Sequence, residues 1–293
     1  MSLIDDIKYK VFNSGSRVNL FIGINVIIFL VIGILSVIET LFTKQSSISL
    51  FVREYLAVPT DLQKLLFRFY TPFTYMFLHA GFFHILFNML WLFYIGKIFE
   101  EFLNSKKVTF VYIAGGLSGA FFYIAAYNIF PYYQDSVALS AAVGASASVT
   151  AIMVATATLL PDYTISLILI GPVRLKWIAV FFIVIDLLSI VGPNAGGYLS
   201  HIGGGIFGFF FIKSLQNGND WSKPFENVFK AKPKLRVVSK NDYQITKKVT
   251  TEPNQEMVDR ILDKISKSGY NNLTAQEKQI LFNASNSNEE KEK

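Results

Sequence analysis

The sequence predicts an all-α membrane protein with six transmembrane helices and a cytoplasmic C-terminal tail. Hydrophobic residues make up 52% of the 293 positions, more than an ordinary soluble domain contains. They gather in long apolar runs, each close to the length that a bilayer core requires. Lysine and arginine alternate between successive loops, as they do in proteins that cross a membrane several times. There is no cysteine, so disulfides and thiolate metal sites are excluded.

The apolar runs, taken in chain order, define the spans. The first run follows a basic segment, residues 1–18, that we expect to be cytoplasmic. This run is too long for a signal-peptide core, so we expect it to be retained as a helix. The fourth and fifth runs are short for a membrane span. The predicted spans are residues 20–39, 82–102, 108–130, 145–160, 175–191 and 199–216, within a membrane domain of residues 19–216.

The charges in the loops predict the orientation. Residues 134–143 and 192–200 contain no lysine or arginine, whereas the alternate loops contain Lys107 and Arg174. Because basic loops favour the cytoplasmic side, both termini are predicted to be cytoplasmic in a multi-pass protein of the cell membrane. The long loop of residues 41–77 is basic and would face outside. Its mixture of apolar and charged residues predicts amphipathic segments in the lipid interface. The net charge of +6 is therefore a topology signal and does not indicate nucleic-acid binding.

Polar residues are found where the even-numbered spans begin. His79, His84 and Asn88 open the second span, Ser146 opens the fourth and His201 opens the sixth. With the N-terminus inside, each of these spans begins at the outer face, so the three groups are expected at one membrane depth. Ionisable residues inside a bilayer are costly and usually functional. The alternative is a polar cluster that only holds helices together, and His79 is expected to brace the loop rather than react.

A serine with an imidazole partner is the minimal requirement for acyl transfer. Ser146 is the predicted nucleophile, because Gly144 helps the backbone turn into the helix and the N–H of Ser146 is free to donate to an oxyanion. Ser118 lies in a Gly-x-Ser-Gly sequence, but its span starts inside, so it is expected near mid-membrane in a packing role. Ser148 is two residues from Ser146 and is expected on a different side of the helix.

Small residues predict that the fourth and sixth spans approach each other closely. Gly204 and Gly208 follow His201 on nearly the same helix face, and the fourth span has alanines to meet them. Close backbone approach would bring His201 within reach of Ser146. The alternative is a glycine motif that serves packing alone.

Asp186 is the remaining acid inside a predicted span, close to its outer end. It could orient His201 as a third member of a triad, but snorkelling or pairing is the favoured interpretation. The histidines have no carboxylate or third ligand at a useful spacing, so no metal and no cofactor are predicted.

Together these residues resemble the rhomboid family of intramembrane serine proteases, of the six-span bacterial type. Residues 79–88, HAGFFHILFN, match the family's His-x4-His-x3-Asn segment, and Gly-Ala-Ser at 144–146 matches its nucleophile motif. His201-Ile-Gly-Gly, with Gly208, matches the histidine motif of the last helix. The resemblance covers roughly residues 19–213. The chain departs from the family pattern at Tyr70 and Thr71, in place of a Trp-Arg pair, at Ala147, where glycine is usual, and at Thr150, where some members have tyrosine.

The resemblance implies a rhomboid-like six-helix bundle and a Ser-His dyad. Ser146 would be the nucleophile and His201 the general base, while His84 and Asn88 would bind the oxyanion with the N–H of Ser146. The implied reaction is cleavage of peptide bonds in or near transmembrane segments of membrane-protein substrates, at a site open to the outer face. Substrates would enter between the second and fifth helices. The alternative is a non-proteolytic rhomboid-like factor in membrane-protein binding or quality control, which would normally lack the serine or the histidine.

The C-terminal region has a different character. Residues 217–250 contain eight Lys or Arg and three acids and are expected to form a basic linker along the inner leaflet. Residues 251–293 are expected to form a small helical tail. In that tail Gly269 ends one helix, and Thr274 with Glu277 forms a capping box for the next. No catalytic role is expected for the tail.

Overall fold

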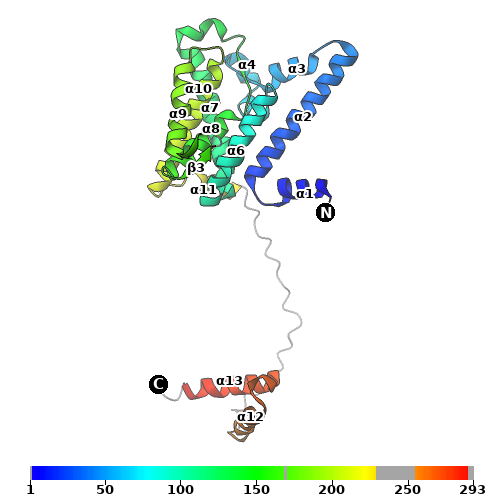
Figure 1. Ribbon diagram of the computed structural model, residues 1–293, viewed down its shortest axis with the longest axis vertical. Helices are drawn as coiled ribbons and strands as arrows, with labels where there is room; N and C mark the ends of the chain where they lie inside the picture. The colour runs from blue at the N-terminus through cyan, green and yellow to red at the C-terminus, as the bar shows by residue number, and fades with distance from the viewer. Residues whose placement is uncertain (1, 168–169, 229–254, 290–293) are drawn as a thin grey trace. The chain divides into compact units, whose positions relative to one another are not determined.

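The computed structural model describes residues 2–167, 170–228 and 255–289. The chain divides into two compact units, Met1–Ala231 and Lys232–Lys293, and helices dominate both (Figure 1).

The first unit is a helical bundle built around one short helix. Its main helices are α2 (Arg17–Thr43), α6 (Phe82–Phe102), α7 (Ser105–Ile129), α8 (Ser146–Leu159), α9 (Leu175–Ser189) and α10 (Ala195–Gln216). Helix α8 contacts α6, α7, α9 and α10, and most of its residues are buried. Helix α2 instead leaves about half of its large apolar side chains exposed, most of them in its second half. In Figure 1, α2 rises from the end where α1 (Leu3–Lys8) lies, and α6 and α10 run in the opposite direction.

Helix length bears directly on the predicted number of spans. Among the described residues, α2, α6, α7 and α10 are long and apolar enough to cross a membrane. Helix α8 has 14 residues and α9 has 15, fewer than the ~20 that a lipid-exposed span requires. All six predicted runs form helices, but four of them meet the requirement. Helix α8 is surrounded by other helices and most of its residues are buried, so the ~20-residue length of a lipid-exposed span does not apply to it directly.

Short elements fill the loop between α2 and α6. The exposed apolar side chains of Leu66 and Phe67 lie between Lys64 and Arg68, so apolar and basic side chains occur together in this part of the loop. These elements are α3 (Ser47–Phe51), η2 (Val52–Leu56), β1 (Val58–Pro59), α4 (Leu62–Phe67), α5 (Thr71–Thr74) and η3 (Tyr75–Phe77).

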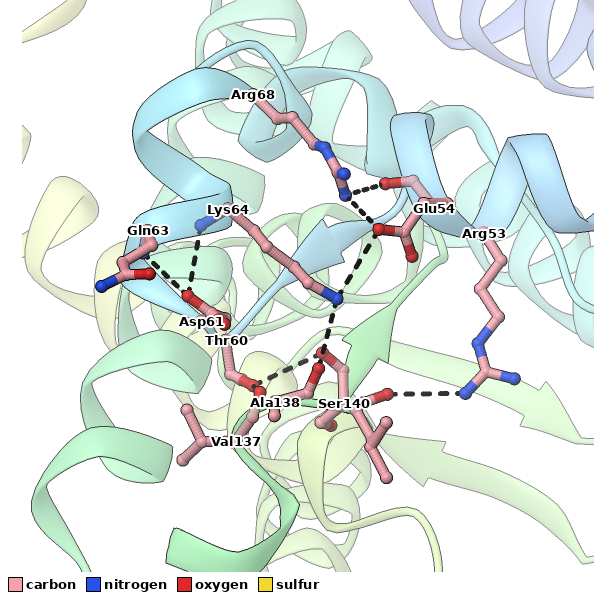
Figure 2. A network of polar contacts seen from close by, with 11 residues as sticks. Arg53, Glu54, Thr60, Asp61, Gln63, Lys64, Arg68, Val137, Ala138 and Ser140 are labelled. Carbon is pink, nitrogen blue, oxygen red and sulfur yellow. Dashed lines mark hydrogen bonds and ion pairs between the residues drawn. The ribbon is translucent and has the colours of Figure 1, made fainter.

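The loop between α2 and α6 contacts residues 137–142, which lead to Ser146. Strand β1 pairs antiparallel with β2 (Ala141–Ala142), with Val58 opposite Ala142. Figure 2 shows the polar contacts beside this pair: Lys64 Nζ donates to the carbonyl of Ala138 at 3.3 Å, and Thr60 Oγ1 donates to that of Val137 at 2.7 Å.

Glu54 joins the two halves of the loop, because both Arg68 and Lys64 form ion pairs with its carboxylate (Figure 2). The hydrogen bond from Arg68 lowers the pKa of Glu54, which keeps this carboxylate charged.

Glycines bring α10 against α8. A Cβ at Gly204 would collide with the carbonyl oxygen of Ala147, and one at Gly208 would collide with that of Ala151. Helix α7 also lies close to α10, since a Cβ at Gly119 would lie 2.7 Å from the carbonyl oxygen of Ser200. The start of α10 is therefore held beside the start of α8.

The beginning of the predicted linker folds onto the bundle. Helix α11 (Ser222–Val228) contacts α7, and Lys107 Nζ lies 2.8 Å from a carboxylate oxygen of Asp220. The Trp221 ring packs against Phe211 of α10 at 6.4 Å between centroids. Residues 217–228 are therefore part of the first unit, and residues 229–250 of the predicted linker lie outside the described residues. The remaining elements of this unit are η1 (Tyr9–Asn13), η4 (Pro131–Ser136), β3 (Thr164–Leu167) and β4 (Gly171–Arg174).

The second unit contains α12 (Gln255–Ser268), η5 (Tyr270–Asn272) and α13 (Ala275–Glu289). Gly269 follows α12 with a φ of 82°, a conformation that favours glycine. Thr274 N–H donates to Glu277 Oε2 at 2.7 Å, and Glu277 N–H donates to Thr274 Oγ1 at 3.3 Å, which is the expected capping box.

Glu277 should make this hairpin sensitive to acid. The bond from Lys264 and the bonds from Thr274 lower its pKa from 4.5 to about 2. A lowered pKa in the folded state means that its stabilisation is complete above pH 4.5 and is lost as the pH falls toward 2. We expect amide protection of α12 and α13 in the full-length protein, measured by hydrogen exchange, to fall over this range. Glu277→Gln should flatten the dependence; equal profiles for wild type and Glu277→Gln would contradict this account.

Candidate active site

One cavity of about 980 Å³ collects the polar residues singled out in the sequence. His84 and Asn88 come from α6, Ser146 from α8 and His201 from α10, and all four line this cavity. It lies where α6, α8 and α10 begin, and part of its wall comes from the segment 140–143 that the first loop holds.

Ser146 is the first residue of α8, immediately after a tight turn. Gly144 has a φ of 141°, which favours glycine, and its N–H donates to the carbonyl of Tyr75 at 2.9 Å. A Cβ at position 144 would lie 2.9 Å from His84 Nε2 and 3.3 Å from Ser146 Oγ. Glycine therefore keeps open the space between these two side chains. As the first helical residue, Ser146 has an N–H with no carbonyl partner inside the helix.

His84 is oriented by its own loop. The backbone N–H of Ala80 donates to His84 Nδ1 at 3.4 Å, so Nδ1 is the acceptor and Nε2 carries the proton of the neutral ring. Nε2 is the atom beside Gly144 and Ser146. Asn88 Nδ2 donates to the backbone carbonyl of His84 at 2.8 Å, and its second N–H remains for another acceptor. Both residues therefore have a donor to offer at the cavity.

His201 contacts a carboxylate. Its Nδ1 lies 3.0 Å from Asp186 Oδ1, and Asp186 is 5% exposed and lines the same cavity. Snorkelling of Asp186 is therefore wrong, because the acid faces the interior of the bundle. In the part of the chain that the structure describes, no hydrogen bond joins Ser146 to His201, although both line the cavity. Such bonds often tighten only when a substrate is bound.

The other residues considered lie away from the cavity. The His79 ring stands 5.0 Å from that of His84, outside the lining, and neither of its nitrogens has a partner in the described residues. Ser118 Oγ donates to the carbonyl of Gly203 at 2.8 Å, which is a packing contact between α7 and α10. Ser148 is fully buried and faces Gly116 of α7. Of the three serines, Ser146 alone lines the cavity.

Two aromatic residues, Trp91 of α6 and Phe182 of α9, line one side of the cavity. The rings of Trp91 and Phe182 meet edge to face, with centroids 5.2 Å apart. The described residues contain no group of three or more His, Asp or Glu side chains that could hold a metal ion.

Comparison with known families gives two matches. The model of the Rhomboid domain matches residues 66–216, more than half of the chain, from the first loop to the end of α10. The model of a family of unknown function, DUF6576, matches residues 248–287, which include α12 and most of α13.

Proposed function

This chain belongs to the rhomboid family, and on that basis we propose that it is an intramembrane serine endopeptidase. Its substrates would be membrane proteins, cut in or near their transmembrane segments. One observation carries the proposal: a serine at a helix start and a histidine with a carboxylate partner line one cavity, together with two further donors. The alternative, a non-proteolytic binding or quality-control factor, has less support because both the serine and the histidine are present.

The proposed reaction uses these groups in sequence. His201 accepts the proton of Ser146, whose Oγ attacks the carbonyl carbon of the scissile bond. Negative charge develops on the carbonyl oxygen, where His84 Nε2–H, Asn88 Nδ2–H and the N–H of Ser146 would donate. His201 then gives its proton to the leaving amine, and an acyl-enzyme on Ser146 is hydrolysed by water.

The proposed topology explains how water reaches the site. If both termini are cytoplasmic, then α6, α8 and α10 begin at the outer face, and the cavity at their starts opens there. In that arrangement all six helices of the bundle cross the membrane, with α8 and α9 as its short members.

Cleavage by the purified protein tests the proposal. The full chain is reconstituted in lipid vesicles with a single-span model substrate, and products are identified by mass spectrometry. We expect one or a few cuts in or beside the substrate's span, and none with Ser146→Ala. A wild-type protein that binds the substrate but leaves it intact supports the binding-factor alternative and contradicts the protease.

Access between α6 and α9 predicts a role for Phe182. It lines one side of the cavity in contact with Trp91, so Phe182→Ala should open that side and raise the rate of cleavage of a transmembrane substrate. Phe181→Ala is the matched control, because Phe181 is exposed on the same helix and does not line the cavity. The two rates are compared in vesicles; an equal effect of both substitutions would argue against access at this place.

The C-terminal unit should be dispensable for cleavage, whereas α11 should contribute to the stability of the first unit. A protein ending at residue 231 keeps the Lys107–Asp220 ion pair and the Trp221 contact, so we expect near-normal cleavage in detergent. A protein ending at residue 216 loses both contacts and should unfold at a lower temperature. Melting temperature and cleavage are measured on both. Loss of cleavage by the protein ending at 231, while it remains folded, would show that the second unit contributes to the reaction.

A further inference from the structure

We propose that Asp186 is a positioning residue for His201, so that the site works as a Ser146–His201–Asp186 triad rather than as a dyad. This inference rests on the proposed peptidase function. Asp186 would act through His201 without touching the substrate.

The contact selects one form of the imidazole. An ionised carboxylate can only accept a hydrogen bond, so the 3.0 Å contact requires the proton of neutral His201 to be on Nδ1. Nε2 is then left without a proton and is free to accept the one from Ser146. Without the carboxylate, the neutral ring can place its proton on either nitrogen, and a ring protonated on Nε2 cannot serve as the base.

The burial of Asp186 is costly, and within the described residues its hydrogen-bond partner is His201. Asp186 is the one acid in α9, and the residues that follow it, Leu187 and Leu188, are exposed and apolar. A carboxylate turned away from water in an apolar helix is unfavourable unless it is paired. His201 is the partner that the structure gives it.

Contacts elsewhere in the fold hold Asp186 and His201 in place. Tyr133 Oη donates to the carbonyl of Ile190 at 2.6 Å, and Tyr132 Oη donates to that of Val191 at 2.9 Å. These bonds fix the end of α9 one helical turn beyond Asp186. On α10 the ring of Tyr198 lies edge-on to that of His201, with centroids 6.2 Å apart. Both members of the pair are therefore held by contacts that do not depend on a substrate.

Kinetics separate a positioning role from a purely structural one. Asp186→Asn keeps the shape but loses the charge, so kcat should fall by ~10²–10⁴ while KM changes little. Asp186→Glu keeps an acceptor and should recover part of kcat. Asp162→Asn is the control, since Asp162 forms ion pairs with Arg174 and Lys176 away from the cavity. A wild-type kcat in Asp186→Asn would overturn the proposal.

The tautomer of His201 gives a readout that does not require activity. The chain has three histidines, so ¹⁵N-histidine labelling gives a spectrum simple enough to assign with His201→Ala. In wild type we expect His201 to carry its proton on Nδ1, and in Asp186→Asn we expect a mixture or a switch to Nε2. A wild-type ring protonated on Nε2 overturns the proposal, even if no substituted protein folds.

The two measurements together keep this inference distinct from the proposed function. A fall in kcat with an unchanged tautomer assigns Asp186 a structural role and overturns positioning. A changed tautomer with normal kcat overturns it as well. If the wild-type protein cleaves nothing, the protease proposal fails, while the spectrum still decides whether Asp186 sets the form of His201.

Discussion

Alanine at Ser146 or His201 should abolish cleavage of a transmembrane substrate, with a fall in kcat of roughly 10⁴–10⁶. The proposed reaction needs an attacking oxygen and a base that accepts its proton. Within the described residues, the cavity lining offers one other histidine, His84, whose Nδ1 already accepts a bond from Ala80. Ser146→Ala should keep the wild-type melting temperature in detergent, because Ser146 is only partly buried. His201→Ala leaves the buried Asp186 carboxylate without its partner, so this protein should melt at a lower temperature, and its cleavage is measured where it is folded.

Two other serines supply controls for this loss. Ser118→Ala removes a packing bond to Gly203, and Ser148→Ala removes a buried hydroxyl that faces α7. Both substituted proteins should retain much of the wild-type kcat once they are folded. Abolished cleavage in Ser118→Ala, with cleavage retained in Ser146→Ala, would reverse the assignment of the nucleophile.

Removing one oxyanion donor should also lower kcat strongly. His84→Ala or Asn88→Ala should lower kcat by ~10²–10³ with a smaller change in KM, because the donor acts on charge that develops in the transition state. His79→Ala is the matched histidine control: it lies beside His84 but outside the cavity lining, so its effect on kcat should be smaller. Steady-state kinetics on one substrate compares all three. A raised KM with a normal kcat in Asn88→Ala would indicate a role in substrate binding instead.

The helices could be predicted well from the sequence, because long apolar runs have few alternatives. The predicted runs at 82–102 and 199–216 match α6 and the larger part of α10, and α2 extends a few residues beyond its predicted run at both ends. Family membership was also predictable, since three short motifs recur in the right order. The number of membrane spans was harder to predict. A span is recognised from the sequence by the length of its apolar run. Helix α8 is short and contacts other helices, so its length does not show whether it spans the membrane.

The contacts between helices and strands could not be predicted from the sequence. The pairing of β1 with β2 cannot be predicted from alternating polarity, because each strand has only two residues. Pro59 in β1 also disfavours a strand. The acid at Asp186 was visible, but helix periodicity does not specify how α9 is rotated toward α10. Helix α11 lies in a basic segment that has no long apolar run, so its packing on the bundle was not predicted. Trp221, which contacts Phe211, is the residue that could have indicated it.

Covalent labelling of one serine tests the central claim most directly. The intact protein in detergent is treated with a fluorophosphonate, which reacts with a serine activated by a base, and the adduct is located by peptide mass spectrometry. The account predicts an adduct on Ser146 that disappears in His201→Ala. An unlabelled wild-type protein that is folded, or an adduct on any other serine, would contradict it.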